Sequence, residues 1–325
     1  MKLPGAKTAK KFSRWLQARL LGGALILGYH RISVAEDDSY QVCVSPKNFA
    51  AQMEALQKYA HPIGLSNLVQ GLKQGVLPPK SVAVTFDDGY ADNLYQAKPL
   101  LEKYAIPATV FICTGYAGKE FWWDELERLV MLSRAEWRAL RLEVGENQFV
   151  WERPQMSPAA DIHARRKFQR ALYFFLFALD IEEKNHAMNT IRSWSGVLSG
   201  EMTARAMNHD ELLRIADDGL IELGAHTRYH SVLPRLSLER QREEIMLGKT
   251  DLEDLLGRQV EGFAYPHGIV AESVKRIVRE SAFTYACMSE SDVIRDNHNF
   301  FQIPRFWPQD WDGEKFTRWL KRWLK

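Results

Sequence analysis

The sequence predicts an α/β fold in which parallel strands alternate with helices. The chain has 325 residues and 46% hydrophobic content, enough to bury a large core and to exclude a disordered protein. Short apolar runs rich in β-branched residues alternate with longer segments whose apolar residues recur every three or four positions. Strands that alternate with helices in this way generally pair in parallel.

The first strand and helix of this pattern occupy residues 23–60. Residues 23–32 (GALILGYHRI) predict a strand, and residues 45–60 predict a helix that begins with Ser45 and has Pro46 in its first turn. The step then recurs along the chain. The further predicted strands are 81–88, 107–115, 221–226, 260–266 and 283–289, and the further predicted helices are 93–105, 209–219, 237–257 and 271–281.

Residues 120–205 interrupt the alternation. They contain a helical run at 121–132, a hairpin pattern at 140–151 and an aromatic-rich helical run at 165–180. Because these helices are too apolar for a linker, we expect an inserted subdomain within a main domain that spans residues 24–308. The sequence leaves open whether the insertion is a lid over the main domain or a buttress away from its site.

Basic residues are concentrated at the two ends of the chain. The net charge is +2, but residues 20–312 carry about −8, which argues against a nucleic-acid-binding surface on the main domain. Residues 1–23 and 309–325 each predict a basic amphipathic helix that contains tryptophan. Such helices either bind an anionic membrane surface or pack their apolar stripe on the main domain, and both interpretations stay open.

Three features predict where the chain resides. No apolar run approaches the roughly 18 residues that span a bilayer. A basic start and a short apolar stretch precede Tyr29, as in a signal peptide, but no small-residue cleavage pattern follows them. We therefore expect a cytoplasmic protein rather than a secreted one. Peripheral binding to the inner face of the cell membrane is compatible with this location. The three widely spaced cysteines form no CxxC motif, which favours reduced thiols. No protein partner is predicted.

Two adjacent carboxylates, Asp87 and Asp88, directly follow the apolar run 81–86. They therefore lie at the carboxyl end of a predicted strand, where barrels of parallel strands place their chemistry. Adjacent like charges repel unless a cation or a proton offsets them. The pair predicts a nearby positively charged partner.

A histidine pair, His226 and His230, follows the predicted strand 221–226. The four-residue spacing would place both imidazoles on one face of a helical turn, although an isolated pair with this spacing is more often packing. Because the strand ends meet at one rim, two imidazoles and one of the two carboxylates are expected to hold Zn²⁺ or a similar divalent ion with one position open for water. The other aspartate could then take a proton from water whose pKa the metal lowers toward about 7.

Three motifs carry a resemblance to a known family. The sequence TFDDG at 85–89, HTRYH at 226–230 and FAYPHG at 263–268 resemble, in order and spacing, the three motifs of the polysaccharide deacetylases of carbohydrate esterase family four. The resemblance covers 24–307 apart from the insertion. It implies a distorted (β/α)7-type barrel and a hydrolase that removes an N-acetyl group from a sugar in a polysaccharide or lipid-linked glycan precursor.

The resemblance also implies roles for individual residues. Asp87 is the expected general base, and Asp88, His226 and His230 are the expected metal ligands, with Zn²⁺ the first choice. The backbone N–H of His267 is expected to stabilise the oxyanion of the reaction. The same motif also contains Tyr265, a candidate substrate-binding residue.

The chain departs from the family pattern at two positions. Ala264 stands where many members have an arginine that orients the catalytic aspartate, so we expect Arg305 to take that role, with a plain salt bridge as the alternative. The late histidine that supplies the general acid is absent, and His30 at the end of the first predicted strand is our candidate for it.

The insertion contributes two candidate substrate-binding residues. Trp123 and Asp124 follow the strand 107–115 and suggest a sugar-stacking platform with a hydrogen-bonding carboxylate, while core packing of the insertion is the alternative. Two other functions stay open: a carbohydrate-binding protein on the same scaffold without turnover, and an O-acetyl esterase.

Overall fold

The computed structural model describes residues 23–34, 38, 40–133, 139–152, 161–197, 202, 204–295 and 298–324. The chain forms two compact units, which we call the barrel unit (residues 1–117 and 207–325) and the inserted unit (residues 118–206). The N-terminal helix predicted within 1–23 lies outside the described residues, apart from residue 23.

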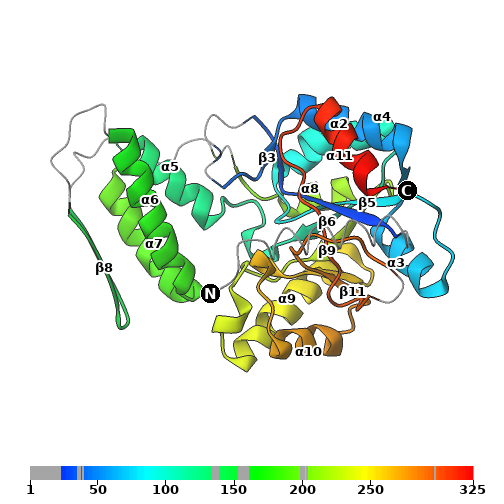
Figure 1. Ribbon diagram of the computed structural model, residues 1–325. Helices are drawn as coiled ribbons and strands as arrows, with labels where there is room; N and C mark the ends of the chain where they lie inside the picture. Colours follow the sequence, from blue (N-terminus) through cyan, green and yellow to red (C-terminus); the bar gives the residue numbers. More distant parts are fainter. Residues whose placement is uncertain are drawn as a thin grey trace, which may run out of the picture. The chain divides into compact units, whose positions relative to one another are not determined.

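The barrel unit is built on a curled parallel sheet (Figure 1). Its strand order is β1 (Leu25–Tyr29), β5 (Ser81–Phe86), β6 (Ala108–Ile112), β9 (Ile221–Ala225), β10 (Gly262–Ala264) and β11 (Tyr285–Cys287), and β4 (His61–Pro62) pairs with the start of β5. Every pair in this sheet is parallel. The predicted α/β fold with a distorted barrel is therefore confirmed.

Residues 303–306 connect the last strand of the sheet to the first. Ile303 forms a parallel bridge with Cys287 of β11, and Phe306 forms one with Leu27 of β1. Backbone hydrogen bonds at both ends hold this segment, including Gly28 N–H to the Phe306 carbonyl at 2.7 Å. The connection places Arg305 between β11 and β1.

Helices follow most strands of the barrel unit. They are α2 (Pro46–Tyr59), α3 (Leu65–Gln74), α4 (Lys98–Tyr104), α8 (His209–Ile215), α9 (Leu238–Leu256), α10 (Glu272–Glu280) and α11 (Gly313–Trp323), with a π-helical turn η1 (Asn93–Ala97) and 3₁₀ turns η2 (Thr114–Tyr116), η4 (Leu233–Arg235) and η5 (Pro266–Gly268). As predicted, the Ser45 side chain caps α2 by accepting a hydrogen bond from Asn48 N–H. A separate two-stranded sheet joins β2 (Arg31–Ile32) and β3 (Cys43–Val44).

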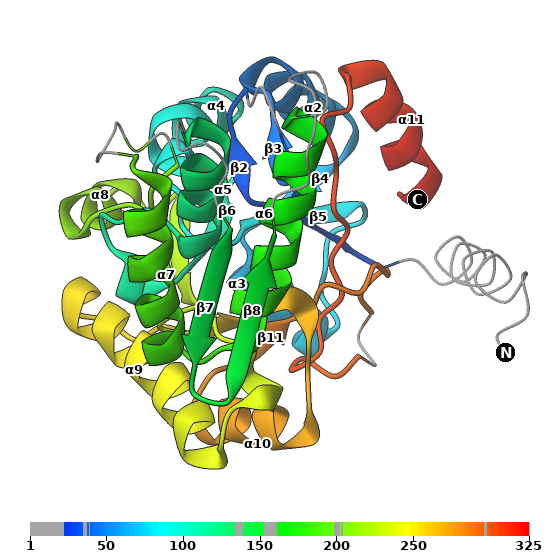
Figure 2. The same cartoon turned by 90° about the vertical axis from the view of Figure 1, so that its left-hand side faces the viewer.

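The C-terminal helix α11 lies beside α2 (Figures 1 and 2). Its apolar residues Phe316, Leu320 and Trp323 are buried, and the Trp323 ring lies 4.8 Å from the ring of Phe306. Of the two interpretations of this helix, packing on the barrel matches the structure, since its apolar stripe is already covered. Among the described helices, none is both long and apolar enough to cross a bilayer.

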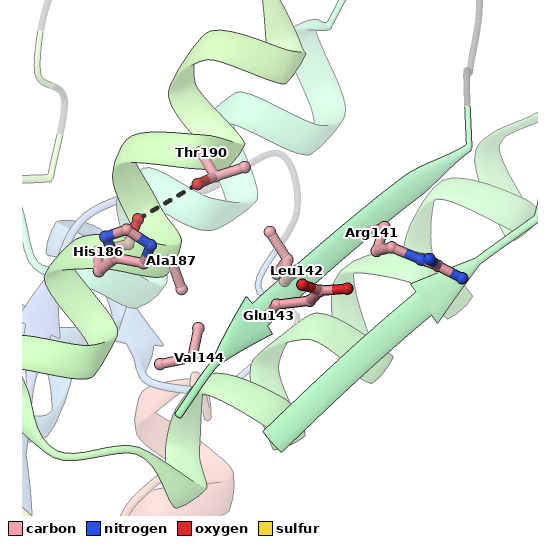
Figure 3. Close-up of a pocket in the computed structure, with 7 residues that line it drawn as sticks. All are labelled: Arg141, Leu142, Glu143, Val144, His186, Ala187 and Thr190. Atoms are coloured by element: carbon pink, nitrogen blue, oxygen red, sulfur yellow. Dashed lines mark hydrogen bonds between the residues drawn. The ribbon is translucent and has the colours of Figure 1, made fainter. Parts of the chain in front are cut away.

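The inserted unit combines helices with a β-hairpin. It contains α5 (Trp122–Leu132), β7 (Leu140–Val144), β8 (Asn147–Trp151), α6 (Asp161–Ala178) and α7 (Ile181–Ser195). A surface pocket of about 340 Å³ lies between β7 and α7 (Figure 3). Residues such as Glu143, His186 and Thr190 line this pocket, and it includes none of the predicted site residues.

Candidate active site

Asp87 forms a buried ion pair with Arg305. The two guanidinium nitrogens Nη1 and Nη2 donate to the two carboxylate oxygens of Asp87, each at 2.7 Å, and Arg305 is fully buried. Arg305 also donates to the Thr85 hydroxyl at 3.2 Å and to the Met288 carbonyl at 3.1 Å. The arginine predicted from the end of the barrel therefore contacts Asp87 in the fork geometry that fixes a carboxylate most firmly.

The ion pair controls the ionisation of Asp87. Burial by itself would raise the pKa of this carboxyl, but the charge and hydrogen bonds of Arg305, together with His226, lower its pKa to about 2. Burial by itself would lower the pKa of the Arg305 guanidinium, but the charge of Asp87 outweighs this effect and raises its pKa. Asp87 is therefore ionised throughout the physiological pH range.

Asp88 lies beside both predicted imidazole ligands. Its Oδ1 atom is 3.6 Å from Nε2 of His226 and 3.4 Å from Nε2 of His230, and the two rings are 4.9 Å apart. The structure thus brings Asp88 together with His226 and His230, although Asp88 and His226 are 138 positions apart in sequence.

The His226 ring is oriented by the third motif. Its Nδ1 atom is 2.8 Å from the Ala264 carbonyl, so Nδ1 carries the proton and Nε2 presents its lone pair toward Asp88. Burial lowers the pKa of His226, against the charge of Asp87, which favours the neutral imidazole that binds metals. Ala264 therefore contributes through its backbone at the position where the family commonly has arginine.

The segment from His226 to His230 is a loop, so the predicted helical turn is wrong. Thr227 and His230 have left-handed backbone angles, with φ of 65° and 55°. Asp88 (φ 71°) and His267 (φ 59°) share this conformation, which is costly for residues other than glycine. Left-handed residues thus occur in all three motifs.

Gly89 has a conformation and surroundings that require glycine. Its φ is 84°, and a Cβ atom there would lie 2.6 Å from Cδ1 of Ile112. The turn after β5, which carries Asp87 and Asp88, therefore depends on this residue.

Cys113 is a neighbour of the site that the sequence analysis did not single out. Its sulfur, a carboxylate oxygen of Asp88 and a ring nitrogen of His226 all lie within 4.8 Å of one another. The thiol donates to the His226 carbonyl at 3.3 Å, and burial followed by the charge of Asp88 raises its pKa. Cys113 is therefore a second candidate for the third ligand, and the role of His230, whose Nε2 atom lies 3.4 Å from Asp88 Oδ1, stays a prediction.

In the third motif, His267 lies beside the site whereas the Tyr265 side chain lies in the core. The His267 ring lies 4.2 Å from that of His230, and its Nε2 atom is 3.2 Å from the His230 carbonyl. Tyr265 is buried in the core, and its hydroxyl donates to the Phe301 carbonyl at 3.0 Å. The His267 residue therefore borders the site, whereas the Tyr265 side chain faces the interior, and its substrate role stays a prediction.

His30 is half-buried and stacks on Trp307. The two ring centroids are 5.1 Å apart, and the Arg305 guanidinium lies 4.7 Å from the Trp307 ring. Burial lowers the pKa of His30 to about 4, with Arg305 and His226 adding to the effect and Asp87 opposing it. His30 is therefore a neutral imidazole at pH 7.

Trp123 and Asp124 lie in the first turn of α5, in the inserted unit. Trp123 stacks on Phe121 with ring centroids 4.7 Å apart, so one of its faces is covered. The neighbouring Trp122 stacks on Tyr173 at 5.1 Å, which identifies it as core packing. The predicted substrate contacts of Trp123 and Asp124 stay predictions.

The donor set fits a divalent ion such as zinc. Two imidazole nitrogens lie within 3.6 Å of the carboxylate oxygen Asp88 Oδ1, and a backbone carbonyl fixes the tautomer of one imidazole. Catalytic zinc sites commonly use three such O and N ligands and leave a position for water. The residues present can therefore hold the metal that the family implies.

Comparison with known proteins identifies the family of the chain. The polysaccharide deacetylase family matches residues 74–132 and 172–286, more than half of the chain. The chain is 22% identical over 314 residues to a poly-β-1,6-N-acetyl-D-glucosamine N-deacetylase of Staphylococcus aureus. This alignment covers 92% of this chain and 82% of that protein.

Solved structures share the fold. The deacetylase PplD of Streptococcus pyogenes, determined with acetate, has a TM-score of 0.60 at 16% identity and covers 91% of this chain and 97% of its own. IcaB from Ammonifex degensii has a TM-score of 0.60 at 18% identity, with 92% and 97% covered. On the family match and the three motifs together, the chain belongs to the polysaccharide deacetylase family.

Proposed function

We propose that the protein is a metal-dependent N-deacetylase that hydrolyses the acetamide group of N-acetylated hexosamine units in a glycan. The observation that carries this proposal is the pair of adjacent carboxylates with different neighbours. Asp87 is bound to Arg305 at 2.7 Å, and Asp88 faces two imidazole nitrogens at 3.6 and 3.4 Å. Such a pair supplies a fixed base beside a site for a cation.

Asp88, His226 and His230 would hold the metal. When bound, a divalent ion supplies Lewis-acid chemistry: it polarises a carbonyl oxygen and lowers the pKa of water. Asp87, held ionised by Arg305, accepts the proton of the attacking water. The His267 backbone N–H is our candidate donor to the developing oxyanion.

The leaving amine needs a proton, and His30 is our candidate donor. Because its pKa is about 4, His30 is neutral at pH 7 and must take up a proton before it can donate one. The proton that Asp87 accepts from the attacking water is the available source, and its transfer to His30 would return Asp87 to its ionised form. Stacking on Trp307 fixes the ring plane of His30.

The substrate class follows from the relatives. Several S. aureus relatives are named for poly-β-1,6-N-acetyl-D-glucosamine, so we propose a polymer of N-acetylglucosamine as the first candidate substrate. A lipid-linked N-acetylated precursor is the second candidate, because the basic residues 1–19 could bind an anionic membrane surface. A binding protein without turnover and an O-acetyl esterase are the competing functions.

Acetate release distinguishes these functions. Purified protein would be assayed with N-acetylglucosamine oligomers, a lipid-linked N-acetylated sugar and an O-acetylated sugar, before and after chelation and after return of Zn²⁺. We expect release from the N-acetylated substrates that chelation abolishes and Zn²⁺ restores. Release that chelation leaves unchanged would refute metal dependence, and release from the O-acetyl ester alone would establish an esterase.

A further inference from the structure

One face of helix α9 supports the loop that carries His226 and His230. The Glu244 side chain is buried, and its Oε2 atom accepts a hydrogen bond from Tyr229 N–H at 2.9 Å. The Glu244 backbone carbonyl accepts a hydrogen bond from Arg228 N–H at 3.1 Å. Glu244 therefore binds the two consecutive loop positions that directly precede His230.

Thr227 and Tyr229 connect Glu244 to the backbone of His230. The Thr227 oxygen accepts a hydrogen bond from His230 N–H at 3.0 Å, and Thr227 is among the residues that interact with the Glu244 carboxyl group. Tyr229, whose N–H donates to Glu244, directly precedes His230 in the chain. The carboxyl group therefore restrains the loop backbone on either side of the peptide that carries His230.

Two further residues of α9 contact the same loop. Gly248 packs directly on Thr227, because a Cβ atom at position 248 would lie 2.7 Å from the Thr227 backbone carbon. Asp251 lies 3.3 Å from Nε of Arg228 and accepts from the Thr114 hydroxyl at 2.7 Å. Positions 244, 248 and 251 fall on one face of a helix, so α9 presents a continuous support to the loop.

The loop needs such support because its backbone is strained. Thr227 and His230 are both left-handed, a conformation that costs of order 1–3 kcal/mol per residue and persists only where surrounding contacts fix it. Without those contacts the backbone of His230 would relax, and its Nε2 atom would leave its place 3.4 Å from Asp88.

We propose that Glu244 is a positioning residue for metal binding, which holds His230 in place through Thr227 and the loop backbone. The inference rests on the proposed function, because it takes His230 as a metal ligand. Residues that orient metal ligands in this indirect way typically change metal affinity about 10- to 100-fold when replaced. Glu244 would therefore act on the affinity for the ion without touching substrate.

Zinc affinity of the full-length chain tests this proposal. Competition with a chromophoric chelator would give the Zn²⁺ dissociation constant of the wild type, Glu244→Gln, Thr227→Ala and His230→Ala, with Glu243→Gln as the matched control. Glu243 neighbours Glu244 on α9 and is exposed. We expect Glu244→Gln and Thr227→Ala each to weaken binding by about 10- to 100-fold and Glu243→Gln to stay within twofold of the wild type.

Thermal unfolding of the metal-free variants separates positioning from loss of fold. A folded Glu244→Gln with wild-type affinity would overturn the inference. If Glu244→Gln does not fold, Thr227→Ala decides, and wild-type affinity there would overturn it equally. Wild-type affinity in His230→Ala would instead refute the ligand set of the proposed function.

Discussion

The two adjacent carboxylates of the site differ in what surrounds them. Asp87 receives two hydrogen bonds of 2.7 Å from the guanidinium of Arg305, and its pKa falls to about 2. Asp88 faces the imidazole nitrogens of His226 and His230 at 3.6 and 3.4 Å. The chain thus supplies the counter-charge for Asp87 itself, whereas the surroundings of Asp88 are those of a site for an added cation. The two adjacent residues therefore differ in their polar partners, although the Nε2 atom of His226 lies within 3.9 Å of both carboxylates.

Replacement of the base is expected to have the largest effect. Asp87→Asn removes the carboxylate that accepts the proton, so acetate release should fall about 10³-fold, within the range for general-base catalysis. Asp254→Asn on the exposed surface of α9 is the matched control and should keep wild-type rates. A rate for Asp87→Asn within tenfold of the wild type would show that another group is the base.

Loss of Arg305 is expected to destabilise the barrel. Arg305→Met leaves the Asp87 charge buried without its guanidinium, which costs about 3–5 kcal/mol in comparable buried pairs. Arg305→Lys keeps the charge but loses the fork geometry, so its stability should be intermediate. Urea denaturation measures both, and a loss below about 1 kcal/mol for Arg305→Met would mean that the pair is not a main stabilising contact.

Replacement of His30 tests the proton donor. His30→Gln should lower kcat about 100-fold at pH 7, the lower end of the effect of a general acid, with little change in KM. Steady-state kinetics on an N-acetylglucosamine oligomer separates the two parameters. A raised KM with unchanged kcat would assign His30 to substrate binding beside Trp307.

The ion pair also predicts how stability depends on acid. The pKa of Asp87 is about 2 in the folded protein, below its value of about 3.9 in the unfolded chain. Its contribution, about 2.6 kcal/mol, is therefore fully present above about pH 5 and is lost progressively as the pH falls through 2. Free energies of unfolding measured from pH 5 to pH 2 should decline less in Asp87→Asn than in the wild type, and parallel curves would contradict this.

The basic ends are expected to have the smallest effect on catalysis. Removal of residues 1–19, which carry six basic residues, should reduce co-sedimentation with phosphatidylglycerol vesicles and leave acetate release from a soluble oligomer unchanged. Arg318→Gln in α11 should change sedimentation less, because the apolar face of that helix is buried. Equal binding by the wild type and the truncated chain would refute the membrane proposal.

Much of the fold could be predicted because its signals are local. The strand β5 is an unbroken apolar run, and α2 begins with a capping serine and a proline. The helix α3 was not predicted, since it is only ten residues long, with Gly71 within it and a glycine cap rather than a polar one. Short elements of this kind are stabilised by packing against the sheet more than by their own propensity.

The site was less accessible to sequence reasoning than the fold. The motifs indicate Asp87, Asp88, His226 and His230, and the missing arginine at position 264 directs attention to Arg305. The left-handed angles of Thr227 and His230 have no glycine or asparagine to signal them, which is why a helical turn was expected. Glu244 is buried because α9 packs against a loop that is distant in sequence. From the sequence alone, a glutamate within a helix is predicted to be exposed.

Metal content of two variants tests the division of roles most directly. Asp87→Asn and Asp88→Asn would be purified in parallel, and bound zinc per chain would be measured by elemental analysis after removal of excess ion. The structure predicts that Asp87→Asn retains close to the wild-type zinc content, because Asp88, His226 and His230 are unchanged, whereas Asp88→Asn loses most of it. Loss of zinc from Asp87→Asn together with retention by Asp88→Asn would contradict the assignment of Asp87 as the base and Asp88 as the ligand.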